Sequence, residues 1–357
     1  SNYFSYDCQY CVNRRSNDVP RAEATPDEIC ELVMNFYKRN YIEGLFLSSA
    51  IKADPDYTMD RLLETVVKLR KLYGFNGYIH LKGIPSANAL TIIRAGEYVD
   101  RMSFNLELPS EKSLKLLAPE KSKEGILTPM NIMANEFHQA KEMKYSKFLP
   151  AGQTTQMIVG ATPESDGQII RLTQGLYKKY SLKRVYFSSY IPANYKNPDL
   201  PVTPIGLLRE HRLYQADWLL RFYGFSASEI LDENENLSND YDPKCGWALK
   251  HPEFFPVEIN IAPPETLVRV PGIGFKSAYK IVEARRYSSL DFCDLEKMRV
   301  VMKRAKHFIT CKGKFYGTDD DIKIKNMLTT ESRTEFATQL SMFSNPEISQ
   351  SALMGEL

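Results

Sequence analysis

Short apolar runs of strand length alternate with helical patterns between residues 25 and 190, and this alternation restricts the fold more than any other feature. Each run is separated from the next by a stretch whose apolar residues recur at helical spacing. Strands joined through helices form a parallel sheet, so we predict an α/β fold, either a barrel or a doubly wound layer. In a barrel, functional residues follow the strands at the carboxyl-terminal mouth. The predicted strands are Ile42–Ser48, Gly77–Leu81, Arg101–Leu106, Thr154–Val159 and Lys183–Ser189.

Start and stop signals place the first two helices. Thr25–Glu28 reads as an N-cap, a proline at the first helical position and a capping-box glutamate. A second helix is predicted from Thr58, and Gly74 ends it. Both signals agree with the apolar periodicity that follows them, which supports the alternating pattern.

The second half of the chain has a different organisation. We expect the proline-rich stretch Pro192–Pro204 to leave the barrel and Leu207–Phe222 to form a long amphipathic helix. Glu265–Phe308 is predicted to be helical, broken by one glycine turn. The predicted domains are a partial barrel over residues 1–195, a helical extension over 196–255, a small all-α domain over 256–316 and an acidic, flexible tail over 317–357.

Charge is distributed unevenly along this second half. Residues 256–316 hold 12 Lys or Arg against 6 Asp or Glu, whereas residues 317–357 hold 3 against 7. A basic module before an acidic tail fits contact with an anionic polymer. A solvated basic surface without a partner is the alternative.

Pro264–Val282 carries the most specific local motif, a predicted helix-hairpin-helix that binds nucleic acid. Glycines in Pro271–Gly274 permit a tight turn and let backbone N–H groups approach a phosphate. The following helix then directs its positive N-terminus at that anion. The residues predicted to bind nucleic acid are Gly272, Ile273, Gly274, Lys276 and Lys280. The alternative is a tight helix–helix turn that packs a core and binds nothing.

The six cysteines are scattered, and their one close pair is Cys8 and Cys11. This usage argues against a disulfide scaffold and for a reducing compartment, which we expect to be the cytoplasm. No apolar run approaches the roughly 18 residues needed to span a membrane, so no membrane partner is expected. Taken alone, the pair is a zinc half-site, a redox pair or an iron–sulfur half-site.

Several long motifs resemble a known family. The chain is similar to the DNA modification and repair radical S-adenosylmethionine (SAM) proteins that end in a helix-hairpin-helix. The resemblance covers nearly all of residues 1–316. Its motifs are Asp7–Asp18, Asn40–Ser49, Gly77–Lys82, Leu116–Ser122, Ala151–Glu164 and Leu208–Phe225.

The resemblance implies a partial (β/α)6 TIM-like barrel of radical SAM type, whose first strand we expect to be missing from this sequence. It implies a four-iron, four-sulfur cluster held by C-x-x-x-C-x-x-C, with SAM on the fourth iron. Reduction by an electron donor then yields a 5′-deoxyadenosyl radical that acts on nucleic acid, DNA being favoured over RNA.

Site residues follow from the resemblance. Cys8 and Cys11 match the second and third cluster ligands. The cofactor-binding residues would be Tyr10 beside the adenine, Ser48 and Ser49 after the family's second strand, Asn105 and Glu107 after its fourth, and Gly160 and Glu164 after its fifth.

The first cluster cysteine is replaced by Phe4, which cannot bind iron. Two hypotheses follow. One is a radical SAM enzyme that modifies or repairs nucleic acid. The other is a non-enzymatic nucleic-acid-binding protein that keeps a degenerate barrel. The catalytic residues and the target base stay unassigned.

Overall fold

The computed structural model describes residues 1–143, 147–192, 194–195, 197–204, 206–318, 320 and 323–329. These residues form two compact units. The N-terminal unit comprises residues 1–164 and 171–206, and the C-terminal unit comprises residues 165–170 and those from 207 onward. In the described part of the chain, no helix is long and apolar enough to cross a membrane.

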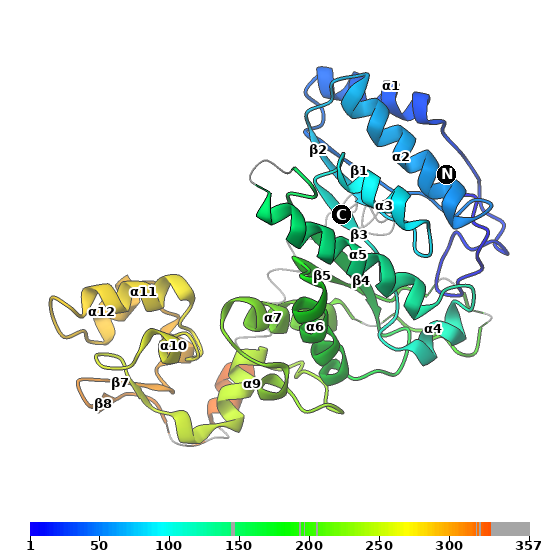
Figure 1. Cartoon of the computed structure of the whole chain (residues 1–357). Helices are drawn as coiled ribbons and strands as arrows, with labels where there is room; N and C mark the ends of the chain where they lie inside the picture. Colours follow the sequence, from blue (N-terminus) through cyan, green and yellow to red (C-terminus); the bar gives the residue numbers. More distant parts are fainter. Residues whose placement is uncertain are drawn as a thin grey trace. The chain divides into compact units, whose positions relative to one another are not determined.

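A five-stranded parallel sheet forms the centre of the N-terminal unit (Figure 1). The strands lie side by side in chain order, so each pairs with its neighbour in sequence. All five match the strands predicted from apolar runs, with ends that differ by at most three residues. They are β1 (Gly44–Leu47), β2 (Tyr78–Lys82), β3 (Arg101–Ser103), β4 (Gln153–Val159) and β5 (Arg184–Ser189).

Four helices of this unit form one layer. Neighbouring helices contact one another in the order α1, α2, α3 and α5, as Figure 1 also shows. A sequential strand order with neighbouring connecting helices is the arrangement of a barrel wall, whereas a doubly wound sheet reverses its strand order. The helices are α1 (Pro26–Lys38), α2 (Pro55–Lys71), α3 (Ala89–Gly96), α4 (Glu111–Leu117), α5 (Lys123–Glu142) and α6 (Asp166–Tyr180), of which residues 171–180 belong to this unit.

The start signals seen in the sequence are present. Thr25 caps α1 with a complete capping box, in which the Thr25 hydroxyl accepts from the Glu28 amide and Glu28 reaches back. The second helix begins at Pro55 behind the N-cap Asp54, three residues before the predicted Thr58. The predicted α/β fold with a parallel sheet is therefore confirmed.

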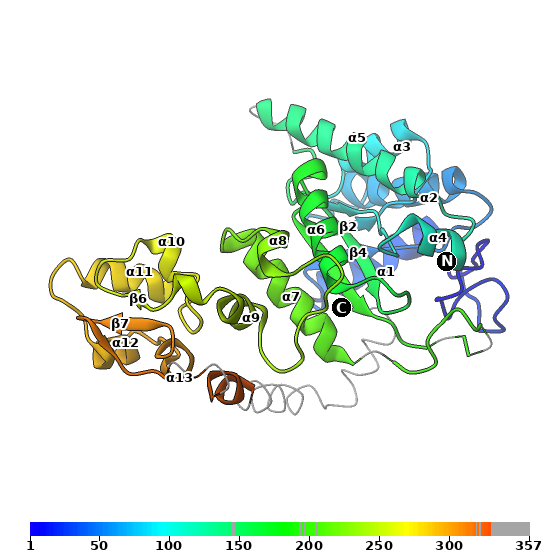
Figure 2. The same ribbon diagram turned by 90° about the horizontal axis from the view of Figure 1, so that it is seen from below.

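The C-terminal unit combines short helices with a small sheet (Figure 2). Helix α7 has the predicted bounds, Leu207–Phe222. The three-stranded sheet pairs β6 (Val257–Glu258) and β7 (Ile309–Cys311) in parallel, and β8 (Lys314–Phe315) antiparallel to β7. The other helical elements are α8 (Ala227–Ile230), α9 (Pro243–Lys250), η1 (Pro252–Phe254), α10 (Pro264–Leu267), α11 (Phe275–Ala284), α12 (Phe292–Lys297) and α13 (Met302–Ala305).

Two expectations for this unit were wrong. It is not all-α, because β6, β7 and β8 form a sheet, and strands of two or three residues are too short for periodicity to reveal. Glu265–Phe308 is interrupted by several turns, including one at Arg299, which has a positive φ of 62°. Of the predicted acidic tail, residues 330–357 lie outside the described residues, and residues 323–329 are helical.

We predict that Leu81→Ala destabilises the N-terminal unit by about 2–5 kcal/mol, the usual cost of removing a fully buried leucine. Leu81 is 0% exposed on β2, the strand between β1 and β3. Urea unfolding of the intact chain measures the effect. Leu72→Ala is the matched control, since this leucine is 74% exposed at the end of α2. Equal losses from both variants would contradict the packing of β2 in the core.

Candidate functional site

Cys8 and Cys11 lie in the loop that precedes α1. The amide of Cys11 donates to the Cys8 carbonyl at 3.0 Å, which closes a turn between them. The Cys8 side chain is buried and that of Cys11 is half-buried. Burial raises the pKa of both thiols, and the nearby Lys121 ammonium acts in the opposite direction. Without a further charge beside them, both side chains are held as thiols.

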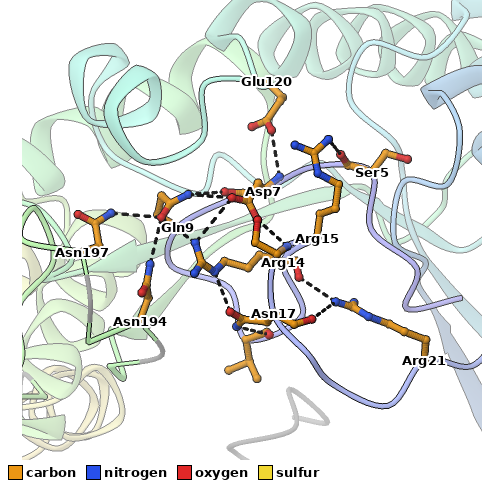
Figure 3. A network of polar contacts seen from close by, with 12 residues as sticks. Ser5, Asp7, Gln9, Arg14, Arg15, Asn17, Arg21, Glu120, Asn194 and Asn197 are labelled. Atoms are coloured by element: carbon orange, nitrogen blue, oxygen red, sulfur yellow. Dashed lines mark hydrogen bonds and ion pairs between the residues drawn. The ribbon is translucent and has the colours of Figure 1, made fainter.

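One guanidinium fixes the backbone of this cysteine loop (Figure 3). Arg21 donates at 2.7–3.0 Å to four backbone carbonyls. Such carbonyls would otherwise remain unsatisfied as the loop folds back on itself. The loop therefore takes its shape from protein hydrogen bonds. The four acceptors are the carbonyls of Asn2, Asn13, Arg14 and Asn17.

Side-chain contacts place the same loop at the carboxyl ends of the strands (Figure 3). The Gln9 side-chain oxygen accepts from Asn194 at 3.0 Å and Asn197 at 3.3 Å, both in the segment after β5. The Asp7 amide donates at 3.0 Å to Glu120, which follows β3 and α4. The loop is thus tied to segments that follow two different strands, where a barrel places its functional residues.

A buried ion pair lies beside the loop. The Lys121 ammonium donates to Glu107 at 3.0 Å and to the Tyr10 hydroxyl at 3.4 Å. Burial alone would lower the pKa of Lys121 and raise that of Glu107, but their mutual attraction outweighs it in both cases. Lys121 therefore stays protonated and Glu107 ionised. Tyr10 also packs on the apolar cluster of Leu108, Leu117, Ala161, Tyr190 and Leu200.

Glu107 extends the sheet beyond the end of β3. Its amide donates to the Gln156 carbonyl at 3.2 Å, and its carbonyl accepts from Ile158 at 2.7 Å, a bridge to β4. Its φ of 66° lies in the left-handed region, which is uncommon for a residue with a side chain. Asn105 is buried and donates to the Gln156 side chain at 3.1 Å. Both predicted residues therefore lie at the β3–β4 junction.

Gly160 and Glu164 follow β4. Gly160 is buried and has a φ of 85°. Glycine adopts this conformation without strain, whereas a residue with a side chain does not. Glu164 accepts a short hydrogen bond from the Ser113 hydroxyl. Burial acts to raise the pKa of Glu164, but hydrogen bonds from Ser110, Ser113 and Thr162 lower it overall. This carboxylate is engaged by hydroxyls of its own unit.

Ser48 and Ser49 line a separate pocket at the end of β1. The Ser49 hydroxyl donates to the Ala50 carbonyl at 2.9 Å, and Ser48 is exposed. The pocket is lined by residues from the chain before α1, from α1, β1 and α2, Lys52 and Arg61 among them. Its lining includes neither Cys8 nor Glu107. The serines thus share the carboxyl side of the sheet with the cysteine loop but not its contacts.

The donor set at the loop does not fit a four-iron, four-sulfur cluster. Such a cluster with one open iron needs three thiolates, and Phe4 stands at the position of the first. Among the described residues, no group of three or more His, Cys, Asp or Glu is placed to hold a metal. The chain therefore supplies two ligands where the family pattern requires three.

Lys121 is the functional-site residue that the sequence did not reveal. It lies in Leu116–Ser122, one of the motifs of the resemblance. Hydrophobic periodicity does not predict which residue a lysine in such a loop will contact. Its contact Tyr10 is 111 positions away in the sequence. The one available signal was a lysine next to a glutamate between two helices. Lys82, at the end of β2, adds a second charge that lowers the pKa of Glu107.

In the C-terminal unit, a tight turn joins α10 to α11. Gly272 has a φ of 82°, and a Cβ there would lie 2.5 Å from the Val301 carbonyl oxygen. The Val301 amide in turn donates to the Gly272 carbonyl at 3.0 Å. Gly272 is therefore required by the close approach of α13. Ile273 is buried in the core of the unit, and both of its backbone polar groups are engaged there: the amide donates to the Val270 carbonyl at 3.1 Å and the carbonyl accepts from Lys244 at 2.6 Å.

Gly274 is the N-cap of α11 and has open space around it, because a Cβ there would meet only the Tyr223 hydroxyl, at 3.6 Å. Lys276 and Lys280 are exposed on α11. Arg285, in contrast, is directed inward and donates to the carbonyls of Ile259 and Ala262. The positive charge beside the turn comes from the two lysines.

A half-buried lysine supports the turn from α9. The Lys244 ammonium donates to the Ile273 carbonyl at 2.6 Å and lies 4.9 Å from the centre of the Tyr223 ring. Burial lowers the pKa of Lys244 to about 7, although the Asp242 carboxylate acts to raise it. Arg304 pairs with Asp242 at 3.2 Å, which joins α13 to the same cluster.

We predict that Phe4→Cys increases the iron and sulfide that the chain retains after anaerobic reconstitution, because it supplies the missing thiolate. Metal analysis and the visible absorbance of the cluster give the readout. Cys8→Ser in the Phe4→Cys background is the control and should remove the gain. A parent chain that already retains a full complement of iron would refute the assignment of only two ligands.

A second prediction concerns Lys244. Its pKa of about 7 lies below the ordinary value of about 10.4, so the unfolded chain binds more protons between these values. The parent should therefore gain stability relative to Lys244→Met as the pH rises from about 7 towards 10. Urea unfolding of both proteins at pH 6 and pH 9 measures this, and Lys250→Met, at an exposed lysine of the same helix, is the control. A pH-independent difference would contradict the lowered pKa.

No family model and no curated protein matches the chain. Among solved structures, it is similar to the FeFe-hydrogenase maturase HydG from Carboxydothermus hydrogenoformans, with 15% identity and a TM-score of 0.44. That match covers 62% of this chain and 49% of the other, about half of its length. A second HydG structure, a maturase of the [FeFe]-hydrogenase, has 11% identity and a TM-score of 0.46, covering 99% and 79%. At these values the likeness assigns neither a family nor an activity.

Proposed function

We propose that this chain is a nucleic-acid-binding protein of the radical SAM type, whose C-terminal unit grips the phosphate backbone through a helix-hairpin-helix. The observation that carries the proposal is the turn before α11. A Cβ at Gly274, the N-cap of this helix, would meet only the Tyr223 hydroxyl within 4 Å, and Lys276, two residues later, is exposed. Backbone N–H groups and a helix dipole at that place favour a phosphate.

The surroundings of the turn support a backbone contact. The turn is held on two sides, by Lys244 at the Ile273 carbonyl and by Val301 at the Gly272 carbonyl. A rigid turn presents its N–H groups without a further loss of entropy on binding. Contacts of this kind position a protein on a nucleic acid without reading its sequence. DNA is the favoured polymer on the family resemblance, and repair or modification is the process it suggests.

The N-terminal unit supports the radical SAM assignment by the placement of its predicted residues. Tyr10, Asn105, Glu107 and Gly160 all follow strand ends or contact residues that do. A bound four-iron cluster would supply an electron to SAM, but two thiolates do not anchor it. In the chain as it stands, the role we assign to this unit is to bind SAM weakly, with Glu107 and Asn105 as its polar contacts.

A second candidate function is favoured by Cys8 and Cys11. Hydrogen bonds give their loop its shape and attach it at the strand ends. A third ligand from outside the chain would then complete a cluster at this loop. The protein would then be a radical SAM enzyme that depends on an electron donor. Iron content of the parent chain separates the two candidates, since the first requires less than a full complement.

We predict that Gly274→Val weakens duplex binding about ten-fold or more while the unit stays folded. A hydrogen bond to a charged group contributes about 1.5–3 kcal/mol, and 1.4 kcal/mol corresponds to a factor of ten. The φ of −90° at Gly274 suits any residue, and the added side chain would cover the helix N-terminus. Fluorescence anisotropy with a labelled duplex, at several salt concentrations, is the measurement.

Gly175→Val is the control, since a Cβ at Gly175 meets nothing within 4 Å. Gly272 is unsuitable for this test, because any side chain there collides with the Val301 carbonyl. Duplex binding by Gly274→Val equal to that of the parent, at the same salt, would make the turn purely structural.

A further inference from the structure

Helix α11 exposes a face in which aromatic and cationic side chains alternate. Phe275 is 58% exposed and Tyr279 is 68% exposed, one turn apart. Lys276 and Lys280, at the same spacing, lie next to them on the outside of the helix. The opposite side of α11 packs inward through Ala278 and Ile281. We call Phe275, Lys276, Tyr279 and Lys280 the α11 face.

The described residues of the C-terminal unit do not neutralise the charge of this face. Neither lysine of the α11 face has an ion-pair partner among the described residues. Glu283 is the one acidic residue of the helix, and Arg286 pairs with it at 3.1 Å. The face therefore carries two uncompensated positive charges beside two exposed rings, which fits an anionic partner that also carries aromatic groups.

Phe275 and Tyr279 lie four positions apart on α11, and the Phe275 ring is held by a neighbouring ring. Phe275 meets the Tyr223 ring edge-on at 5.8 Å and 90°, which fixes its position while more than half of it stays exposed. Positions four apart on a helix are separated by about 6 Å along the axis. Bases stacked in a duplex strand are about 3.4 Å apart. Two rings at the wider spacing suit bases that are unstacked from one another.

We propose that the α11 face binds an unpaired stretch of nucleic acid, with Phe275 and Tyr279 stacked on bases and Lys276 and Lys280 on the neighbouring phosphates. Aromatic platforms interleaved with cationic side chains are the way single strands are bound without sequence preference. The inference rests on the proposed function and deepens it, because it assigns single-stranded or gapped nucleic acid as the preferred substrate. A protein partner would also cover the exposed rings, but its binding would not require a lysine without an ion-pair partner beside each ring.

The test compares a labelled oligothymidylate with a labelled duplex, using the intact chain and anisotropy at fixed salt. Tyr279→Ala should weaken single-strand binding roughly ten-fold, the usual effect of losing one stacked base, and leave duplex binding unchanged. Tyr279→Phe should restore it, since stacking needs the ring and not the hydroxyl. Tyr41→Ala is the matched control, a tyrosine of the other unit that is 70% exposed.

Lys280→Ala serves as a second probe. It should weaken single-strand binding and reduce the slope of log affinity against log salt by about 0.7, the value for one phosphate of a single strand. Circular dichroism melting of each variant verifies that α11 remains folded.

The outcomes separate the two proposals. A parent that binds neither oligonucleotide refutes the proposed function itself. A parent that binds both, with Tyr279→Ala unchanged on the single strand, refutes the α11 face alone and leaves a protein as its remaining occupant. Selective loss of single-strand binding in Tyr279→Ala, absent in Tyr279→Phe, supports the inference.

Discussion

The ion pair between Lys121 and Glu107 is the interaction on which the strand-end site depends. Both groups are largely removed from water, and a buried charge is tolerated only beside its opposite. Through the Tyr10 hydroxyl, Lys121 also reaches the cysteine loop. One ammonium thus links the loop before α1 to the junction of β3 and β4. Removing it would leave Glu107 without its ion-pair partner.

The turn before α11 depends on a constraint of a different kind, the close approach of two backbones. The Val301 carbonyl leaves no room for a Cβ at position 272, so a glycine is required there. At position 274 the surroundings are open, and a Cβ would have no such collision. The two glycines therefore have separate roles, one in packing and one in exposure. Gly272 thus belongs to the packed side of the turn and Gly274 to its open side.

The sequence predicted the parallel sheet well, because five apolar runs separated by helical segments are compatible with few arrangements of the strands. It did not predict β6, β7 and β8, since strands of two or three residues form only when distant segments pair. It located Tyr10 and Glu107 through a family pattern, but not the lysine between them. Contacts such as Lys244 with the Ile273 carbonyl are set by packing, and no local pattern records them.

The four hydrogen bonds of Arg21 have a consequence for how such a barrel can change over time. In many small metal sites the ion organises the loop, so losing one ligand unfolds the site. Here the loop is already closed by protein contacts, and a substitution such as phenylalanine at position 4 leaves that closure in place. The donor set at position 4 is then uncoupled from the fold of the loop. Substitutions at this position can accumulate or revert while Arg21 keeps the loop in its shape.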